Sequence, residues 1–199
     1  MLVTVKEIQA WLSDYTEAIE KNKDYLSELD TPIGDGDHGN NMNRGMSEYQ
    51  KAFEAKQPQT ITETFKVLSM ALISKVGGAS GPLYGSAFMN LTKASKDLTE
   101  ITSEKQLGDL FETGLSGIQA RGKAVAGDKT MVDVWQPVVE QLKHSDLSKN
   151  NIEAAKEQTK DMQAKKGRAS YLGERSIGHI DPGAASSALL FQSLLPYLN

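Results

Sequence analysis

The chain has 199 residues, of which 39% are hydrophobic and 24% charged, with a formal net charge of −4 and no cysteine. This composition is typical of a globular protein, and the lack of cysteine excludes disulfides, thiolate metal sites and cysteine nucleophiles. The scattered basic residues argue against nucleic acid as a partner, and no apolar run is long enough for a membrane span. Because the N-terminus lacks the basic and apolar regions of a signal peptide, we expect a cytoplasmic protein with one domain over residues 1–199.

Helical patterns dominate the sequence in chain order. Thr4 and Glu7 form a capping-box pattern, which predicts a helix that ends near residue 26. Further helix starts are marked by Thr60 with Glu63, Ser103 with Gln106, Thr130 with Asp133, and Asp181 followed by Pro182. Less marked segments near residues 40–55, 82–97 and 150–165 bring the total to about eight helices. No segment shows sustained strand alternation, so the sequence predicts an all-α bundle whose chemistry lies in the loops at helix ends.

The segment after the first predicted helix carries three carboxylates within eight residues: Asp30, Asp35 and Asp37. The glycines between and after them let the backbone turn tightly enough to bring the carboxylates to a common point. Carboxylates held close together need a counter-ion, and oxygen ligands suit hard divalent cations. An EF-hand is excluded, because its fifth, sixth and twelfth positions would be Gly39, Asn40 and Met46. The pattern favours a Mg²⁺ site open to phosphate over the alternative of a solvated Asp/Gly turn.

Three more glycine-rich segments lie at predicted helix ends. Around Ser80, glycines precede a helix start that can bind an anion through backbone N–H groups, although a simple helix connector is an equal alternative. The segment before Thr130 and Met131 is not a Walker A loop, because Asp128 separates the second glycine from the lysine. Thr130 is a candidate helix cap there, and Met131 is either an apolar nucleotide contact or a core residue. Arg168, in the third segment, either clamps a phosphate or remains solvated.

The histidines do not point to nucleophilic catalysis. His38 and His179 are candidate general bases, but no Ser/His/Asp pattern accompanies them in the sequence. We therefore expect them to have structural or hydrogen-bonding roles.

Four segments together resemble the ADP-binding subunits (subunit L) of phosphotransferase-system-dependent dihydroxyacetone kinases. In order, and over essentially the whole chain, they are DTPIGDGDHGNNM, GGASGPLYG, RGKAVAGDKTMVDVW and GRASYLGERSIGHIDPGA. The resemblance implies an eight-helix antiparallel barrel that holds ADP and two Mg²⁺ ions in the loops at one end. It implies that the metal ligands are Asp30, Asp35 and Asp37. The nucleotide contacts that it implies are His38, Gly39, Asn40, Asn41, Ala79, Ser80, Gly81, Gly122, Thr130, Met131, Arg168, Asp181, Pro182 and Gly183.

The same resemblance implies an activity. Bound ADP would be phosphorylated in place by a phosphohistidine carrier subunit of the phosphotransferase system. The phosphoryl group would then pass to dihydroxyacetone on a separate subunit K, giving dihydroxyacetone phosphate in glycerol metabolism. No covalent nucleophile is expected, since proteins catalyse phosphoryl transfer mainly by positioning and charge neutralisation. Two alternatives stay open: an ATP-exchanging kinase module of the same fold, and a regulatory module stabilised by divalent ions without catalysis.

Overall fold

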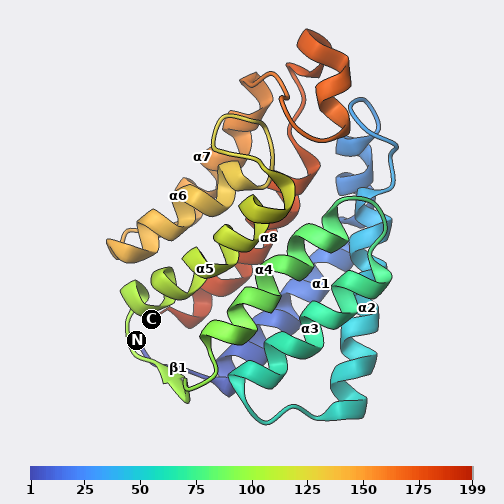
Figure 1. The fold of residues 1–199 in the computed structure, drawn as a ribbon. Coiled ribbons are helices and arrows are strands. Elements are labelled where there is room, and N and C mark those ends of the chain that lie inside the picture. Colours follow the sequence, from blue (N-terminus) through green and yellow to red (C-terminus); the bar gives the residue numbers. More distant parts are fainter. Residues whose placement is uncertain (199) are drawn as a thin grey trace.

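The computed structural model describes residues 1–198, and eight α-helices form most of this described chain (Figure 1). The helices are α1 (Val5–Asp30), α2 (His38–Lys56), α3 (Ile61–Lys75), α4 (Ser80–Ala94), α5 (Glu104–Gly122), α6 (Val132–Lys143), α7 (Lys149–Gln158) and α8 (Pro182–Leu194). Three 3-10 segments are η1 (Thr159–Asp161), η2 (Arg168–Ser176) and η3 (Leu195–Tyr197). The short strands β1 (Val3–Thr4) and β2 (Glu100–Ile101) pair antiparallel. Among the described residues, no helix has the length and apolarity needed to cross a membrane.

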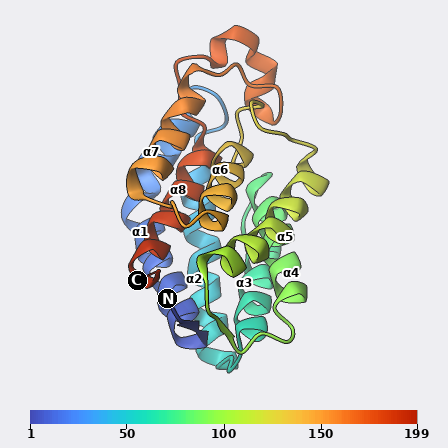
Figure 2. The same ribbon diagram turned by 90° about the vertical axis from the view of Figure 1, so that its left-hand side faces the viewer.

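The helices are arranged in a closed ring. Each helix packs against the next one in the chain, and α8 packs against α1 (Figures 1 and 2). Successive helices run in opposite directions, so the loops gather at the two ends of the ring. This arrangement confirms the predicted eight-helix antiparallel barrel.

Local sequence signals explain where several helices begin. The Glu7 carboxylate accepts a hydrogen bond from the Thr4 backbone N–H at 2.8 Å, which completes the predicted capping box of α1. The Asp181 carboxylate accepts from the Ala184 N–H at 2.8 Å, and Pro182 takes the first helical position of α8. Both helices therefore start where the sequence predicts.

Other helix boundaries differ from the prediction. The first helix continues to Asp30 instead of ending near residue 26, and it stops where Pro32 has no N–H to continue the helical ladder. The helix α6 begins at Val132, because the Asp133 carboxylate turns back to accept from the Thr130 N–H at 2.7 Å. The segment near residues 150–165 is helical only to residue 158 and then tightens into η1. The extension of α1 matters most, since it fixes Asp30 on a rigid helix end.

An aromatic cluster fills the interior of the ring. The Phe111 ring meets the rings of Trp11, Trp135 and Phe191 edge-on, with centroids 5.6, 6.1 and 5.5 Å away. These four side chains come from α5, α1, α6 and α8, and all are fully buried. Edge-on packing is a favourable geometry for aromatic rings. The loops at the barrel ends therefore rest on a densely packed core.

Candidate functional site

Four loops meet at the barrel end opposite β1: residues 31–37, 76–79, 123–131 and 159–181 (Figure 1). A pocket of about 220 Å³ lies between them. Most of the predicted site residues line it: Asp30, Asp35, Asp37, His38, Asn41, Ala79, Ser80, Thr130, Met131, Arg168, Asp181, Pro182 and Gly183. Residues far apart in the sequence are thus brought together at one place.

The other four predicted residues lie outside the pocket lining. Gly39 packs α2 against α1, where an added Cβ would lie 1.7 Å from a backbone oxygen of α1. Gly81 is buried at the start of α4, where an added Cβ would lie 2.4 Å from the Val76 carbonyl oxygen. Asn40 is exposed in the first turn of α2, and Gly122 is the last residue of α5. Both buried glycines shape the backbone around the pocket, and a nucleotide contact by any of these four residues stays a prediction.

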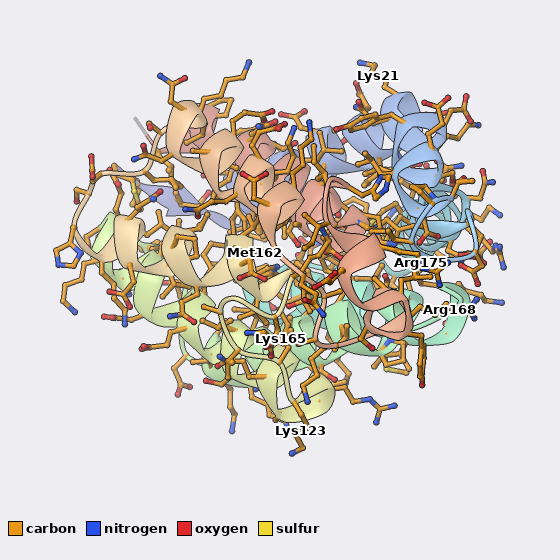
Figure 3. All side chains as sticks on the ribbon, turned by 90° about the horizontal axis from the view of Figure 1, so that it is seen from above. Lys21, Lys123, Met162, Lys165, Arg168 and Arg175 are labelled. Carbon is orange, nitrogen blue, oxygen red and sulfur yellow. The ribbon has the colours of Figure 1, made fainter. Side chains whose placement is uncertain are left out.

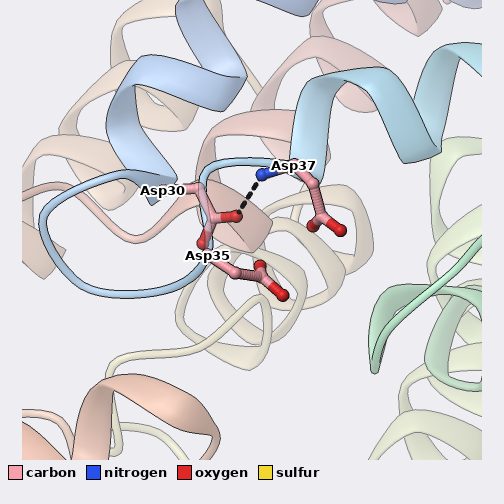
Figure 4. A group of neighbouring side chains, drawn as sticks. All are labelled: Asp30, Asp35 and Asp37. Carbon is pink, nitrogen blue, oxygen red and sulfur yellow. Dashed lines mark hydrogen bonds between the residues drawn. The ribbon is translucent and has the colours of Figure 1, made fainter.

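The three aspartates converge at one wall of the pocket (Figure 4). Each offers a carboxylate oxygen, and these atoms all lie within 4.8 Å of one another. Gly36 forms the turn between Asp35 and Asp37. Its backbone φ of 76° is one that residues other than glycine rarely adopt. The Asp30 carboxylate accepts from the Asp37 and His38 N–H groups at 3.0 and 3.2 Å, which fixes the loop.

Charge and burial at this wall suit a hard cation. Burial raises the pKa of Asp30, and the neighbouring Asp35 raises it further. The donor set consists only of oxygens, two exposed carboxylates and one buried, which fits Mg²⁺ or another hard divalent ion. The Arg168 guanidinium partly balances the cluster, with its Nη1 atom 2.6 Å from an Asp35 oxygen. Because both partners of this ion pair are exposed, little free energy is needed to exchange it for a ligand.

The start of α4 forms a second wall, and it suits an anion. No side chain in the described part of the chain caps this helix, so its first N–H groups remain available beside Ala79 and Ser80. The start of α2 is different, since its N–H groups near His38 and Gly39 already donate to Asp30 and Ser27. A phosphate is therefore better accommodated at α4 than at α2.

Burial also shifts the pKa values of His38 and Asp181 in the pocket. The pKa of His38 falls to about 4, so the imidazole is neutral. The pKa of Asp181 rises to about 7, although its carboxylate caps α8 and lies near Lys129. His179 contributes only its carbonyl oxygen to this region, as an acceptor for Lys129. The His38 ring makes hydrogen bonds to Ser80 and Ser186, while a structural role for the His179 side chain stays a prediction.

Lys129 is a pocket residue that sequence reasoning missed. Its side chain is only 1% exposed, and its φ of 62° turns the backbone so that the ammonium points inward. The ammonium donates to the carbonyl oxygens of Thr159, at 2.6 Å, and His179, which ties the 123–131 loop to the 159–181 loop. Burial lowers the pKa of Lys129, an effect that nearby acids such as Asp181 oppose. The only sign of Lys129 in the sequence was its position in a glycine-rich loop. Its spacing from the glycines matches no phosphate-binding motif, so the sequence did not mark it as a site residue.

Comparisons with known proteins give a consistent result. A model of the DAK2 domain matches residues 32–196. The chain is 57% identical over 185 residues to the PEP-dependent dihydroxyacetone kinase 1 ADP-binding subunit DhaL of Listeria innocua, covering 93% of this chain and 92% of that one. It is 53% identical over 194 residues to the PTS-dependent dihydroxyacetone kinase ADP-binding subunit DhaL of Lactococcus lactis, covering 98% of each.

A solved structure is similar in fold. The dihydroxyacetone kinase from C. freundii in complex with AMP-PNP and Mg²⁺ aligns with a TM-score of 0.74 at 22% identity. The alignment covers 94% of this chain and 33% of that kinase. The helical barrel described above is thus also present as one part of a longer chain.

Proposed function

Because the chain belongs to the DAK2 domain family, and is similar over nearly its whole length to ADP-binding subunits, we propose that it is the ADP- and Mg²⁺-binding subunit of a multi-subunit dihydroxyacetone kinase. Bound ADP is phosphorylated in place by a phosphohistidine carrier subunit, and the phosphoryl group passes to dihydroxyacetone on a separate subunit K. All of this takes place in the cytoplasm, and residues 1–199 form a single nucleotide-binding domain. The observation that carries the proposal is the convergence of three carboxylates in the same pocket as the uncapped start of α4.

In this proposal, different walls of the pocket have different roles in phosphoryl transfer. Asp30, Asp35 and Asp37 would hold the two Mg²⁺ ions of the proposal, and bound Mg²⁺ would neutralise charge on the phosphate oxygens. The N–H groups at the start of α4 and the Ser80 hydroxyl donate to the phosphates. Residues 129–131 and the start of α8 line the rest of the pocket, and we expect the remainder of the nucleotide to lie against them. The protein thus contributes positioning and electrostatics, and no side chain forms a covalent intermediate.

The face around the pocket carries basic side chains and an exposed aromatic ring beside the carboxylates of the acidic loop. Lys123, Lys165, Arg168 and Arg175 lie on this face (Figure 3). Nearby in η2, the Tyr171 side chain is 89% exposed. Basic groups steer an acidic partner, and an exposed aromatic ring is a typical anchor residue. This surface supports the assignment of the carrier subunit and subunit K as partners that approach from the pocket side.

The direct test is to identify the small molecules that the purified protein releases on denaturation. We expect close to one ADP for each chain, retained through gel filtration. Free exchange of the nucleotide for ATP would instead favour the ATP-exchanging module. Binding of ADP and Mg²⁺ without phosphoryl turnover in the presence of the partners would favour a regulatory module.

Asp37→Asn tests the metal site within this function. We expect phosphoryl transfer with the partner subunits to fall by at least about a hundredfold, since the lost charge weakens the metal that offsets developing negative charge. Circular dichroism should match the wild type, because Asp37 lies in a loop and not in the core. Asp97→Asn, an exposed aspartate at the other end of the barrel, is the matched control. Retention of more than about a tenth of the rate by Asp37→Asn would contradict its role as a metal ligand.

A further inference from the structure

A line of polar side chains runs from the pocket into the apolar interior of the barrel. We name it the buried hydrogen-bond chain, and its members, in order from the pocket, are Ser80, His38, Ser186, Tyr84, Ser187 and Trp135. Tyr84, Trp135 and both interior serines are fully buried, whereas Ser80 and His38 line the pocket. Polar groups are costly to bury, and simple packing of a helical barrel does not require them. Their continuity with the phosphate wall suggests a functional role.

The direction of the hydrogen bonds is set at the inner end. The Trp135 indole N–H can only donate, and it donates to the Ser187 hydroxyl oxygen at 3.1 Å. Among the described residues, the other partner of the Ser187 hydroxyl is the Tyr84 hydroxyl, at 2.8 Å, so Ser187 donates its proton there. The neighbouring Tyr15 hydroxyl donates to the Ser186 carbonyl oxygen at 3.3 Å, so Tyr84 donates its own proton to the Ser186 hydroxyl at 2.7 Å. Each hydroxyl accepts from the interior side and donates toward the pocket.

The next step decides which nitrogen of His38 carries the proton. The Ser186 hydroxyl lies 2.9 Å from His38 Nε2 and 3.2 Å from the Gly183 carbonyl oxygen. The shorter contact continues the one-way chain, and hydrogen bonds in such a chain polarise and strengthen one another. If Ser186 donates to Nε2, the neutral imidazole must carry its proton on Nδ1. Nδ1–H then donates to the Ser80 hydroxyl oxygen at 3.0 Å.

We propose that the buried hydrogen-bond chain fixes His38 in the Nδ1–H tautomer and thereby turns the Ser80 hydroxyl proton toward the pocket, as a donor to a nucleotide phosphate oxygen. Trp135, Ser187, Tyr84 and Ser186 are positioning residues that act through His38. The proposal rests on the proposed function for the identity of the ligand. The opposite tautomer would make Ser80 donate to Nδ1 and present lone pairs to the pocket. Lone pairs repel a phosphate, and four aspartate side chains already line that pocket.

Nitrogen-15 NMR of the imidazole rings tests the tautomer directly in the nucleotide-free protein. The chain has three histidines, so His38 can be assigned by comparing spectra of single His→Gln variants. We expect the wild-type spectrum to show a protonated Nδ1 and an unprotonated Nε2 for His38. Tyr84→Phe removes the donor to Ser186, and its His38 should shift toward the Nε2–H form. A wild-type Nε2–H form would overturn the proposal, whatever the protein binds.

A double-mutant cycle on ADP binding in excess Mg²⁺ tests the consequence for Ser80. By calorimetry, Ser80→Ala should weaken ADP binding about tenfold, and Tyr84→Phe about three- to tenfold, as expected when a hydrogen bond to a charged group is lost. The double variant should bind no more weakly than Ser80→Ala, since both changes remove the same donor. If the double variant loses ADP affinity by the product of the two single losses, the role of the buried hydrogen-bond chain is overturned. An unchanged ADP affinity in Ser80→Ala would overturn it as well.

A matched control separates this effect from general damage to the core. Tyr49 is 3% exposed on α2 and lies outside the buried chain, so Tyr49→Phe should change neither the His38 spectrum nor ADP affinity. If the wild-type protein binds no ADP, the proposed function fails, while the NMR spectrum still decides the tautomer. The two proposals can thus fail separately.

Discussion

At the scale of single residues, Arg168 has two competing partners. Its guanidinium pairs with Asp35, which is also a proposed metal ligand, and it borders the pocket proposed for ADP. A metal ion at the carboxylates would displace the guanidinium from Asp35 and leave it free to pair with a phosphate. The sequence predicted the second contact, and the structure adds the first.

Arg168→Ala should therefore have opposite effects on the two ligands. We expect ADP binding in excess Mg²⁺ to weaken by about 1.5–3 kcal/mol, or roughly ten- to hundredfold in Kd. Binding of Mg²⁺ alone should be unchanged or tighter, because the competing cation is gone. Arg168→Lys should recover only part of the ADP affinity, since a point charge does not reproduce a planar fork. Calorimetry measures both constants, and an unchanged Kd for ADP in Arg168→Ala would place this side chain outside the site.

Asp181 gives a prediction for stability against pH. Its pKa of about 7 in the folded protein lies above its ordinary value of 3.8, so the folded state holds a proton that the unfolded state has released. The stability of the nucleotide-free protein should fall as the pH rises from about 4 to about 7, and this contribution should be flat above that range.

Asp181→Asn keeps a helix cap but cannot ionise, so it should lose this dependence. Thermal melting without metal should show a gain in Tm of a few degrees over the wild type at pH 8 and little difference at pH 4. A Tm difference that is the same at both pH values would show that the carboxyl group does not titrate in this range.

At the scale of elements, the close approach of α1 and α2 positions the acidic loop between them. Gly39→Ala places a methyl group against the α1 backbone and must push the helices apart. We expect a loss of about 1–3 kcal/mol in the free energy of unfolding, together with weaker Mg²⁺ binding.

Gly108→Ala is the matched control, because its methyl group would crowd Lys143 between α5 and α6 at the other barrel end. It should destabilise the fold without affecting Mg²⁺. Unfolding in urea and metal titration measure the two effects. If Gly39→Ala keeps the wild-type affinity for Mg²⁺, the helix contact does not position the carboxylates.

Local patterns predicted the elements because caps and apolar periodicity act over one or two turns. The capping box at Thr4 and the Asp181-Pro182 start of α8 are examples. The start of α6 was harder to place, because the Asp133 carboxylate inside the helix accepts from the Thr130 N–H before it and the helix begins only at Val132. The ring itself followed from the family resemblance, since no short-range pattern states that α8 packs against α1.

In the site, too, short-range features could be predicted from the sequence and long-range contacts could not. The acidic loop could be predicted because its three carboxylates lie close in the sequence to the glycines that turn it. Lys129 was not, because its partners are carbonyl groups 30 and 50 residues further along the chain. The buried hydrogen-bond chain was invisible for the same reason, since serine and tyrosine in a helix carry no pattern that marks a long-range contact.

At the scale of the whole molecule, a ligand that binds only the folded barrel must stabilise it. A ligand at a hundredfold excess over Kd adds about 2.7 kcal/mol, which corresponds to about 5–10 °C in the Tm of a chain of this size. We expect EDTA to lower the Tm of the Mg²⁺- and ADP-loaded wild type by several degrees and that of Asp35→Asn much less. Differential scanning fluorimetry measures both. Equal sensitivity to EDTA would remove Asp35 from the metal site.

The contact of α8 with α1 has a consequence for biosynthesis. The Trp11 indole N–H donates to the Leu190 carbonyl oxygen at 2.8 Å, and the two residues are 179 positions apart in the chain. On the ribosome, α1 emerges first and α8 after the other seven helices, so this contact forms late. Until α8 is in place, the barrel remains open on one side. Phe111 and Trp135 then lack their contacts with the Phe191 ring. Such exposed apolar surface makes the incomplete barrel prone to aggregation until the eighth helix closes the ring.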